Sequence, residues 1–95
     1  MLEKQIERRL VEGVKQQGGL CYKFVSPGHP GVPDRLIITK AGQVIFVELK
    51  TATGRLSKLQ EYTIGEMRKR NADVRVLWGL DDVKSFLKEV MPNDF

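Results

Sequence analysis

Two short apolar stretches, separated by a turn, constrain the fold of this chain most. Residues 35–40 and 43–50 are rich in isoleucine, valine, leucine and phenylalanine, and Ala41-Gly42 lies between them. This pattern predicts two strands joined in a β-hairpin. Because both faces of the strands are largely apolar, we expect them near the middle of a sheet that is covered on both sides.

The flanking sequence predicts helices for this sheet. Leu2, Ile6, Leu10 and Val14 recur at four-residue steps, which is one stripe of an amphipathic helix over residues 2–17. Two glycines follow and end that helix.

The remaining segments complete the order αβββαβα. A strand at 20–25 precedes a stiff loop with three prolines, and a polar loop leads to a helix at 57–70. A strand at 74–78 and a helix through Val90, capped by Asp81 or Asp82, come next. We therefore expect one α/β domain over residues 1–95, with a mixed central sheet flanked by helices.

Composition excludes several classes of protein. Of the 95 residues, 41% are hydrophobic and 29% are charged, which is typical of a globular domain. Cys21 is the only cysteine, so an internal disulfide and a zinc site built on thiolates are both excluded. The N-terminal residues are charged and no apolar run reaches membrane-spanning length, so we expect a cytoplasmic protein with no membrane association. The net charge of +4 favours a polyanionic partner.

The candidate chemistry lies in Asp34 and, fourteen residues later, in Glu48-Leu49-Lys50. Glu48 and Lys50 are two apart on a strand, so their side chains point to the same face. The hairpin register decides whether Asp34 joins them. A two-residue loop would turn Asp34 to the opposite face, whereas a three-residue loop ending at Gly42 pairs Asp34 with Glu48. We predict the three-residue loop, because it also pairs apolar side chains across the two strands.

Two carboxylates about 5 Å apart at their Cβ atoms repel one another unless a cation or a shared proton intervenes. Oxygen ligands favour Mg²⁺ or Mn²⁺, which take one or two carboxylates together with waters and phosphate oxygens. Such an ion polarises a phosphodiester and supplies a nucleophile, while the Lys50 ammonium stabilises the developing charge. The alternative is structural: Asp34 caps a strand end, and Glu48 with Lys50 forms an exposed ion pair. The apolar stretch before Glu48 favours the metal site.

Three segments resemble the signatures of the VRR-NUC family, a branch of the PD-(D/E)XK nucleases with a restriction-endonuclease-like core. They are Gly31-Val32-Pro33-Asp34-Arg35-Leu36, Phe46-Val47-Glu48-Leu49-Lys50-Thr51 and Arg55-Leu56-Ser57-Lys58-Leu59-Gln60. The resemblance runs from the first helix to about Trp78 and covers most of the chain. The family occurs at the end of the Fanconi-associated nuclease and as short stand-alone proteins, often phage-encoded. The resemblance thus implies that the protein acts in the cytoplasm of a bacterial or phage-infected cell.

The resemblance also implies roles for individual residues. Asp34 and Glu48 would bind the metal, with the carbonyl group of Leu49 as a third ligand. Lys50 would be the catalytic lysine, and Gln60 would assist at the start of the following helix.

Two of the implied positions have alternatives. Gln60 and Ser57 also match a capping box, which needs no role in the site. The family carries an acidic residue in its first helix, and we predict Glu7 for this catalytic and metal-binding position. Glu3, one helical turn earlier, is the other candidate, and either glutamate also suits a helix N-terminus.

Basic and polar residues near these segments are the predicted DNA contacts, because lysine and arginine bind most phosphate groups. We predict this role for Lys23, His29, Arg35, Arg55 and Lys58. For His29, an exposed loop residue without a role is the alternative.

These observations predict a metal-dependent endonuclease that hydrolyses phosphodiester bonds in DNA. Since stand-alone members of the family behave as resolvases, the resemblance implies a Holliday (four-way) junction as substrate. Two matched cuts would then require a homodimer. The alternatives are a nuclease specific for flaps or other DNA structures, a non-catalytic DNA-binding module, and a protein-interaction domain with a structural acidic cluster.

Overall fold

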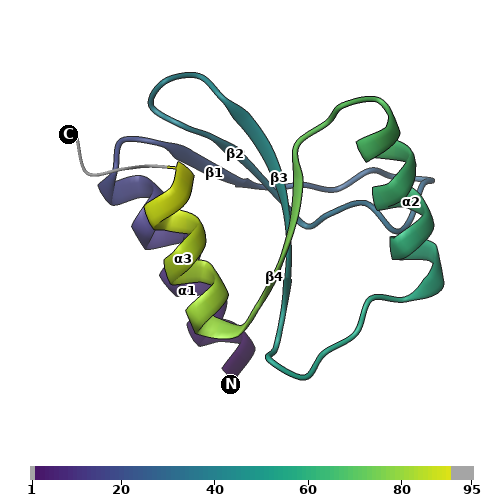
Figure 1. Ribbon diagram of the computed structural model, residues 1–95, viewed down its shortest axis with the longest axis horizontal. Coiled ribbons are helices and arrows are strands. Elements are labelled where there is room, and N and C mark those ends of the chain that lie inside the picture. The colour runs from purple at the N-terminus through teal and green to yellow at the C-terminus, as the bar shows by residue number, and fades with distance from the viewer. Residues whose placement is uncertain (1, 91–95) are drawn as a thin grey trace.

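The computed structural model describes residues 2–90, without the side chain of Leu2, and has a four-stranded sheet between helices (Figure 1). Its elements are α1 (Leu2–Gln16), β1 (Leu20–Lys23), β2 (Arg35–Ile38), β3 (Val44–Lys50), α2 (Lys58–Lys69), β4 (Val74–Trp78) and α3 (Gly79–Val90). The predicted α/β fold class and the order αβββαβα are confirmed. Residues 1 and 91–95 of the predicted domain lie outside the described residues.

The sheet is mixed and follows the order of the chain, β1-β2-β3-β4. The first three strands pair antiparallel, and β4 pairs parallel to β3. A parallel neighbour requires a crossover connection, and α2 provides it. Because β3 has a partner on each side, it is an interior strand, as the apolar pattern predicts.

The register of the β2–β3 hairpin is the predicted one. Leu36 lies opposite Phe46 and Ile38 lies opposite Val44. The turn closes through the Thr39 N–H, which donates to the Gln43 carbonyl at 2.9 Å. Gly42 has a φ of 93°, the left-handed conformation that the three-residue loop requires.

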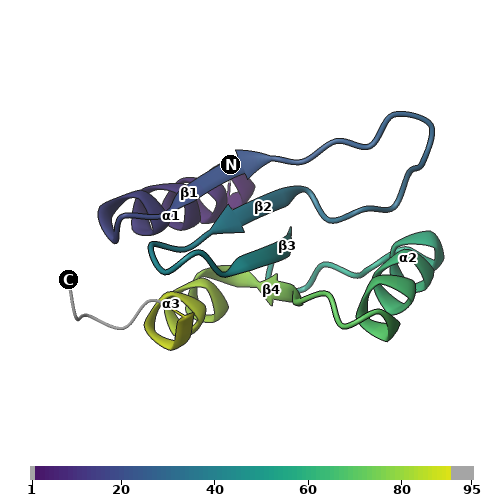
Figure 2. The same cartoon turned by 90° about the horizontal axis from the view of Figure 1, so that it is seen from above.

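Helices α1 and α3 lie side by side on one face of the sheet, and the main core lies beneath them (Figures 1 and 2). The predicted stripe of α1 is confirmed at three positions, since Ile6, Leu10 and Val14 are fully buried. The side chain of Leu2 lies outside the described part. None of the helices within residues 2–90 is long and apolar enough to cross a membrane.

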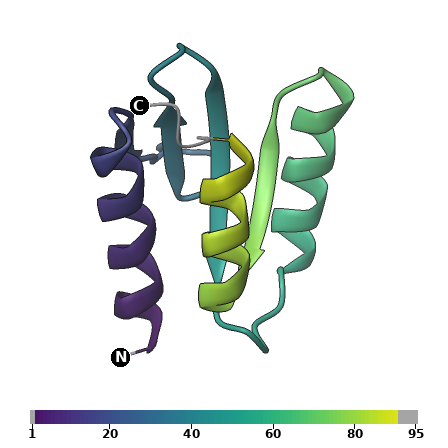
Figure 3. The same ribbon diagram turned by 60° about the vertical axis from the view of Figure 1, so that its left-hand side comes forward.

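Within residues 2–90, the second face of the sheet carries only α2, which packs beside β4 on the side away from α1 and α3 (Figure 3). This leaves the β1 side of the face exposed, and Tyr22 on β1 is 52% accessible. Val44 on β3 is also exposed. The prediction of full cover on both faces is therefore wrong for this half of the sheet, because the crossover helix lies over one edge.

The last helix begins earlier than predicted. It starts at Gly79, directly after β4, so Asp81 and Asp82 lie in its first turn and neither precedes the helix as a cap. The Asp82 side chain instead accepts a hydrogen bond of 2.8 Å from the backbone N–H of Trp78. The carboxylate therefore ties the helix back to the end of β4.

Two helical glycines give a matched test of this packing. A Cβ atom at Gly13 of α1 would lie 2.4 Å from the Leu87 Cδ1 atom of α3, whereas a Cβ atom at Gly65 of α2 meets nothing within 4 Å. Gly65→Ala should raise the free energy of unfolding by about 0.5–1 kcal/mol through helix propensity. Gly13→Ala has the same gain in helix propensity, but overpacking costs about 1–3 kcal/mol, so the net change should lower the free energy of unfolding or leave it unchanged. Urea denaturation measures both, and a stabilising Gly13→Ala would contradict the close α1–α3 packing.

Candidate active site

The central hairpin brings the predicted acidic residues together. Arg35 of β2 pairs with Val47 of β3, so Asp34, the residue before β2, stands at the level of Glu48. β3 continues beyond the start of β2 as far as Lys50. Since Glu48 and Lys50 are two apart on this strand, both side chains lie on the face that α2 partly covers.

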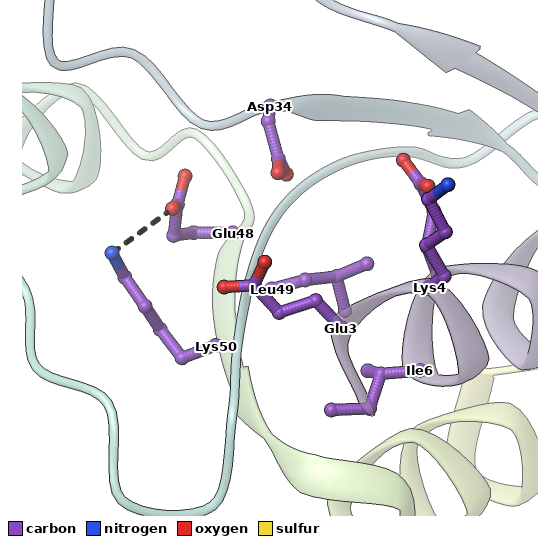
Figure 4. A pocket seen from close by; sticks show the side chains of 8 residues that line it. Glu3, Lys4, Ile6, Asp34, Glu48, Leu49 and Lys50 are labelled. Carbon is purple, nitrogen blue, oxygen red and sulfur yellow. Dashed lines mark ion pairs between the residues drawn. The ribbon is translucent and has the colours of Figure 1, made fainter. Parts of the chain in front are cut away.

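The side chains of Asp34, Glu48 and Lys50 line a cavity of about 350 Å³ (Figure 4). The N-terminal half of α1 forms its opposite wall and contributes Glu3 and Glu7. Acidic groups from three segments far apart in the sequence therefore share one pocket.

Glu48 is fixed by two contacts on the same carboxylate oxygen. Its Oε2 atom lies 3.5 Å from the Lys50 Nζ atom and accepts a hydrogen bond of 3.1 Å from the Gln60 Nε2 atom. The residue is only 5% exposed. This burial argues against the predicted alternative of a solvated surface ion pair, because a buried charge needs specific partners.

Gln60 combines the two roles that its sequence position allows. Its side-chain Oε1 atom accepts the N–H of Ser57, and the Ser57 hydroxyl accepts the N–H of Gln60, which together form a capping box. The amide nitrogen remains free for Glu48. The first turn of α2 thus holds the Glu48 carboxylate and satisfies its own backbone at the same time.

The loop before β2 is held against α2, and this sets the position of Asp34. A Cβ atom at Gly31 would lie 2.9 Å from both the Leu59 Cγ atom and the Thr63 hydroxyl of α2. Only a residue without a side chain allows this approach without a shift. The backbone carbonyl of Asp34 also accepts the Phe24 N–H at 2.9 Å, which ties both ends of the loop together.

The surroundings of Asp34 and Glu48 disfavour the charged forms of both carboxylates. Burial raises the pKa of Asp34, although the backbone N–H of Leu49 and the charge of Arg35 partly offset it. Burial and the nearby Asp34 charge raise the pKa of Glu48, against the effect of Lys50. The Oδ1 atom of Asp34 is buried and has no hydrogen-bond partner within residues 2–90.

This donor set fits a hard divalent cation. An orphaned buried carboxylate oxygen beside a second carboxylate is the arrangement that a cation would neutralise. No group of three or more His, Cys, Asp or Glu side chains suited to a metal occurs within residues 2–90. Asp34 and Glu48 would therefore hold the ion with waters, substrate oxygens and the predicted Leu49 carbonyl, as Mg²⁺ commonly requires.

The assignment of Glu7 as the acidic residue that the first helix contributes to the site stays a prediction, because Glu3 and Glu7 both line the pocket. The Glu7 carboxylate forms an ion pair with the Arg35 guanidinium on the far side of β2 from Asp34. Figure 4 shows Glu3 extending from α1 into the pocket. The Glu7–Arg35 pair therefore ties α1 to β2, and Glu3 keeps its carboxylate within the cavity.

The predicted DNA contacts fall into two groups. Lys23, Arg55 and Lys58 are exposed, whereas the Arg35 side chain is only 13% accessible and is paired with Glu7. His29 is exposed and lines a second cavity, away from the acidic pocket. Their roles in DNA binding stay predictions.

Sequence reasoning missed two residues at this site. Lys4 lines the pocket, and its position one turn before Glu7 on the same helix is the signal that points to it. Trp78 of β4 pairs with Lys50 of β3, and its indole N–H donates to the Gly54 carbonyl at 2.9 Å. That bond holds the loop between β3 and α2, and the register of β4 that creates it is not readable from the sequence.

Comparisons with known proteins agree with this geometry. Residues 21–80 match the model of the VRR-NUC domain. This chain belongs to the VRR-NUC family. It therefore carries a nuclease-family domain, and the predicted membership is confirmed.

Two relatives extend the comparison. A solved structure titled "VRR_NUC domain" superposes with a TM-score of 0.88 at 27% identity, over 95% of this chain and 98% of that one. A protein named "Putative nuclease p44", from Acyrthosiphon pisum secondary endosymbiont phage 1, is 56% identical over 48 residues. That match spans 50% of this chain and 52% of the phage protein.

The raised pKa values predict an unusual effect of pH on stability. At a pH between the ordinary and the raised pKa values, the metal-free native protein keeps Asp34 and Glu48 protonated, whereas both groups are ionised in the unfolded chain. The contribution of Asp34 and Glu48 to the free energy of unfolding therefore falls as the pH rises from about 4 through the raised pKa values, and does not recover at neutral pH. Asp34→Asn removes one buried charge, so it should raise the unfolding temperature at neutral pH in EDTA and flatten this dependence.

The matched control is Asp81→Asn, which neutralises an exposed carboxylate in the first turn of α3. It should not stabilise the protein, because that charge is solvated and favourable at a helix N-terminus. Thermal unfolding in EDTA from about pH 4 to about pH 8 measures both variants. An Asp34→Asn protein no more stable than the unchanged chain at neutral pH would contradict the electrostatic account.

Proposed function

We propose that this chain is a divalent-metal-dependent endonuclease that hydrolyses phosphodiester bonds in DNA. The observation that carries the proposal is the buried pair of Asp34 and Glu48 beside Lys50 in an open cavity. Two uncompensated carboxylates alone would repel a phosphate, so a module that only binds DNA gains nothing from them. Membership of the VRR-NUC family and the likeness to a phage protein named as a nuclease support the same activity.

Each residue of the site has a separate task in this reaction. When bound by Asp34 and Glu48, Mg²⁺ or Mn²⁺ supplies Lewis-acid polarisation of the phosphodiester and a water of lowered pKa. The Lys50 ammonium, on the same strand face, stabilises the negative charge that develops on the phosphate oxygens. Gln60 keeps the Glu48 carboxylate oriented through its amide hydrogen bond.

The charge of the chain supports a nucleic-acid substrate. The net charge is +4 although four acidic residues line the pocket. Exposed Lys23, Arg55 and Lys58 are available to bind the phosphates of the strand, which positions it without reading its sequence. We expect the activity in the cytoplasm of a bacterial or phage-infected cell.

We further propose that the substrate is branched DNA, above all the four-way junction, and that the active form is a homodimer. The described residues 2–90 form one pocket that contains Asp34, Glu48 and Lys50, whereas a resolvase must make two matched cuts. A two-fold pair of chains supplies the second pocket. A flap or another branched structure is the alternative substrate.

Cleavage of labelled DNA tests the proposal. Four-way junction, flap and linear duplex DNA are each incubated with Mg²⁺, Mn²⁺ or EDTA. Paired, symmetric cuts in the junction are expected with either metal and none in EDTA. Lys50→Ala should slow cutting by about 10²–10³-fold, as the loss of one transition-state donor does. Lys40→Ala, an exposed lysine in the hairpin turn at the other end of β3, should leave the rate unchanged.

The possible outcomes separate the parts of the proposal. Metal-dependent cutting of flaps or duplex, without junction cuts, would retain the nuclease and reject the resolvase. If the protein sediments as a monomer both with and without junction DNA, the proposed dimer is rejected. No metal-dependent cutting of any substrate would reject the enzyme and leave the DNA-binding module.

A further inference from the structure

A second cavity, of about 460 Å³, opens between α2 and the part of the sheet that α2 leaves uncovered. Its walls include three aromatic side chains, Phe24, Phe46 and Tyr62, and it is called the aromatic cavity here. Phe24 and Phe46 pack with their ring centroids 5.4 Å apart and their planes tilted by 60°. Tyr62 on α2 is 64% exposed. No part of residues 2–90 fills this space between the rings.

The aromatic cavity has no lining residue in common with the acidic pocket, but three segments run from one to the other. Phe46 and Glu48 are two apart on β3, so their side chains share one face about 7 Å apart along the strand. Thr63, which also lines the aromatic cavity, follows Gln60 by three residues and so lies on the same side of α2. The Phe24 N–H donates to the Asp34 carbonyl, which joins the third aromatic wall to the first acidic residue.

The short distance between Phe46 and Glu48 limits what the aromatic cavity can bind. Any ligand in it lies within about one or two nucleotide steps of Glu48. A DNA strand that leaves the acidic pocket along this side of β3 passes its neighbouring nucleotides over Phe46 and Tyr62. Aromatic rings are the surfaces on which bases of single strands stack, and this stacking tolerates any sequence.

We propose that the aromatic cavity binds one unpaired nucleobase of the DNA strand, beside the phosphate held in the acidic pocket. The proposal rests on the proposed function and names the substrate feature that the same site selects. Its lining also carries His29 and Arg70, which are donors for a base edge or a phosphate. A base in continuous duplex must first be unpaired and unstacked, whereas a branch point or flap presents one already free. Selection of branched DNA follows from this difference.

A second copy of the chain is the competing occupant, and the lining argues against it. The centres of protein interfaces are depleted of charged residues. The aromatic cavity instead contains Glu66 and Arg70, which pair with each other at 3.0 Å. A hollow lined by rings and charges suits a base better than an apolar protein surface.

The proposal is tested with single-stranded oligonucleotides that carry 2-aminopurine at successive positions, with Ca²⁺ in place of Mg²⁺, so that the acidic pocket can hold the phosphate while cutting is suppressed. Stacking on an aromatic ring quenches the fluorescence of this base. The unchanged protein should quench it, and Tyr62→Ala should lose the quenching and bind about tenfold more weakly. Tyr62→Phe should restore both. Tyr22→Ala should behave as the unchanged protein, because Tyr22 is exposed on the same sheet face outside the aromatic cavity.

Several results would overturn the proposal. These are no binding of the oligonucleotides, binding without quenching at every labelled position, or equal quenching by Tyr62→Ala. Conversion of a dimer into a monomer by Tyr62→Ala, seen in sedimentation, would assign the aromatic cavity to a second copy. The experiment needs no cleavage, so failure of the nuclease assay leaves its outcome unaffected.

Discussion

The carboxylates of Asp34 and Glu48 lie close together in an open pocket, and the neighbouring elements offset the energetic cost of burying these two charged groups. Burial raises the pKa of both groups, and one Asp34 oxygen has no hydrogen-bond partner within residues 2–90. A fold that only needed stability would not retain this arrangement, because apolar side chains of similar size fit such a position at lower cost. The unfavourable burial of these two carboxylates is consistent with a site in which a bound cation neutralises them.

The rest of the architecture supplies the support that this site needs. β3 is an interior strand, and Glu48 pairs with Val76 of β4 one residue beyond the end of the β2–β3 pairing. α2 brings Gln60 to the same carboxylate, and its capping box holds that amide in place. Trp78 holds the connecting loop through Gly54. Rigid elements on every side keep the reacting groups within a narrow range of positions, as catalysis requires.

Local patterns in the sequence predicted what depends on local structure. The hairpin register followed from the alternation of Leu36, Ile38, Val44 and Phe46 and from Gly42, so the meeting of Asp34 with Glu48 was predictable. The capping box of Ser57 with Gln60 was predictable for the same reason.

Features that depend on how distant elements pack were not predictable. The start of α3 at Gly79 and the pairing of Glu7 with Arg35 depend on tertiary contacts. Half of one sheet face is open because α2 covers only one edge of the sheet. The residue pattern of α2 does not predict which edge the helix covers. The aromatic cavity was missed for this reason: apolar alternation in β3 indicates burial and does not distinguish a covered face from an open one.

Calorimetric titration with Mn²⁺ tests the central claim most directly, because it asks whether the two carboxylates form a cation site without relying on any substrate. The account predicts saturable binding of about one ion per chain to the unchanged protein, with no saturable binding to Asp34→Asn. Absence of binding to the unchanged chain, or equal binding by Asp34→Asn, would contradict it.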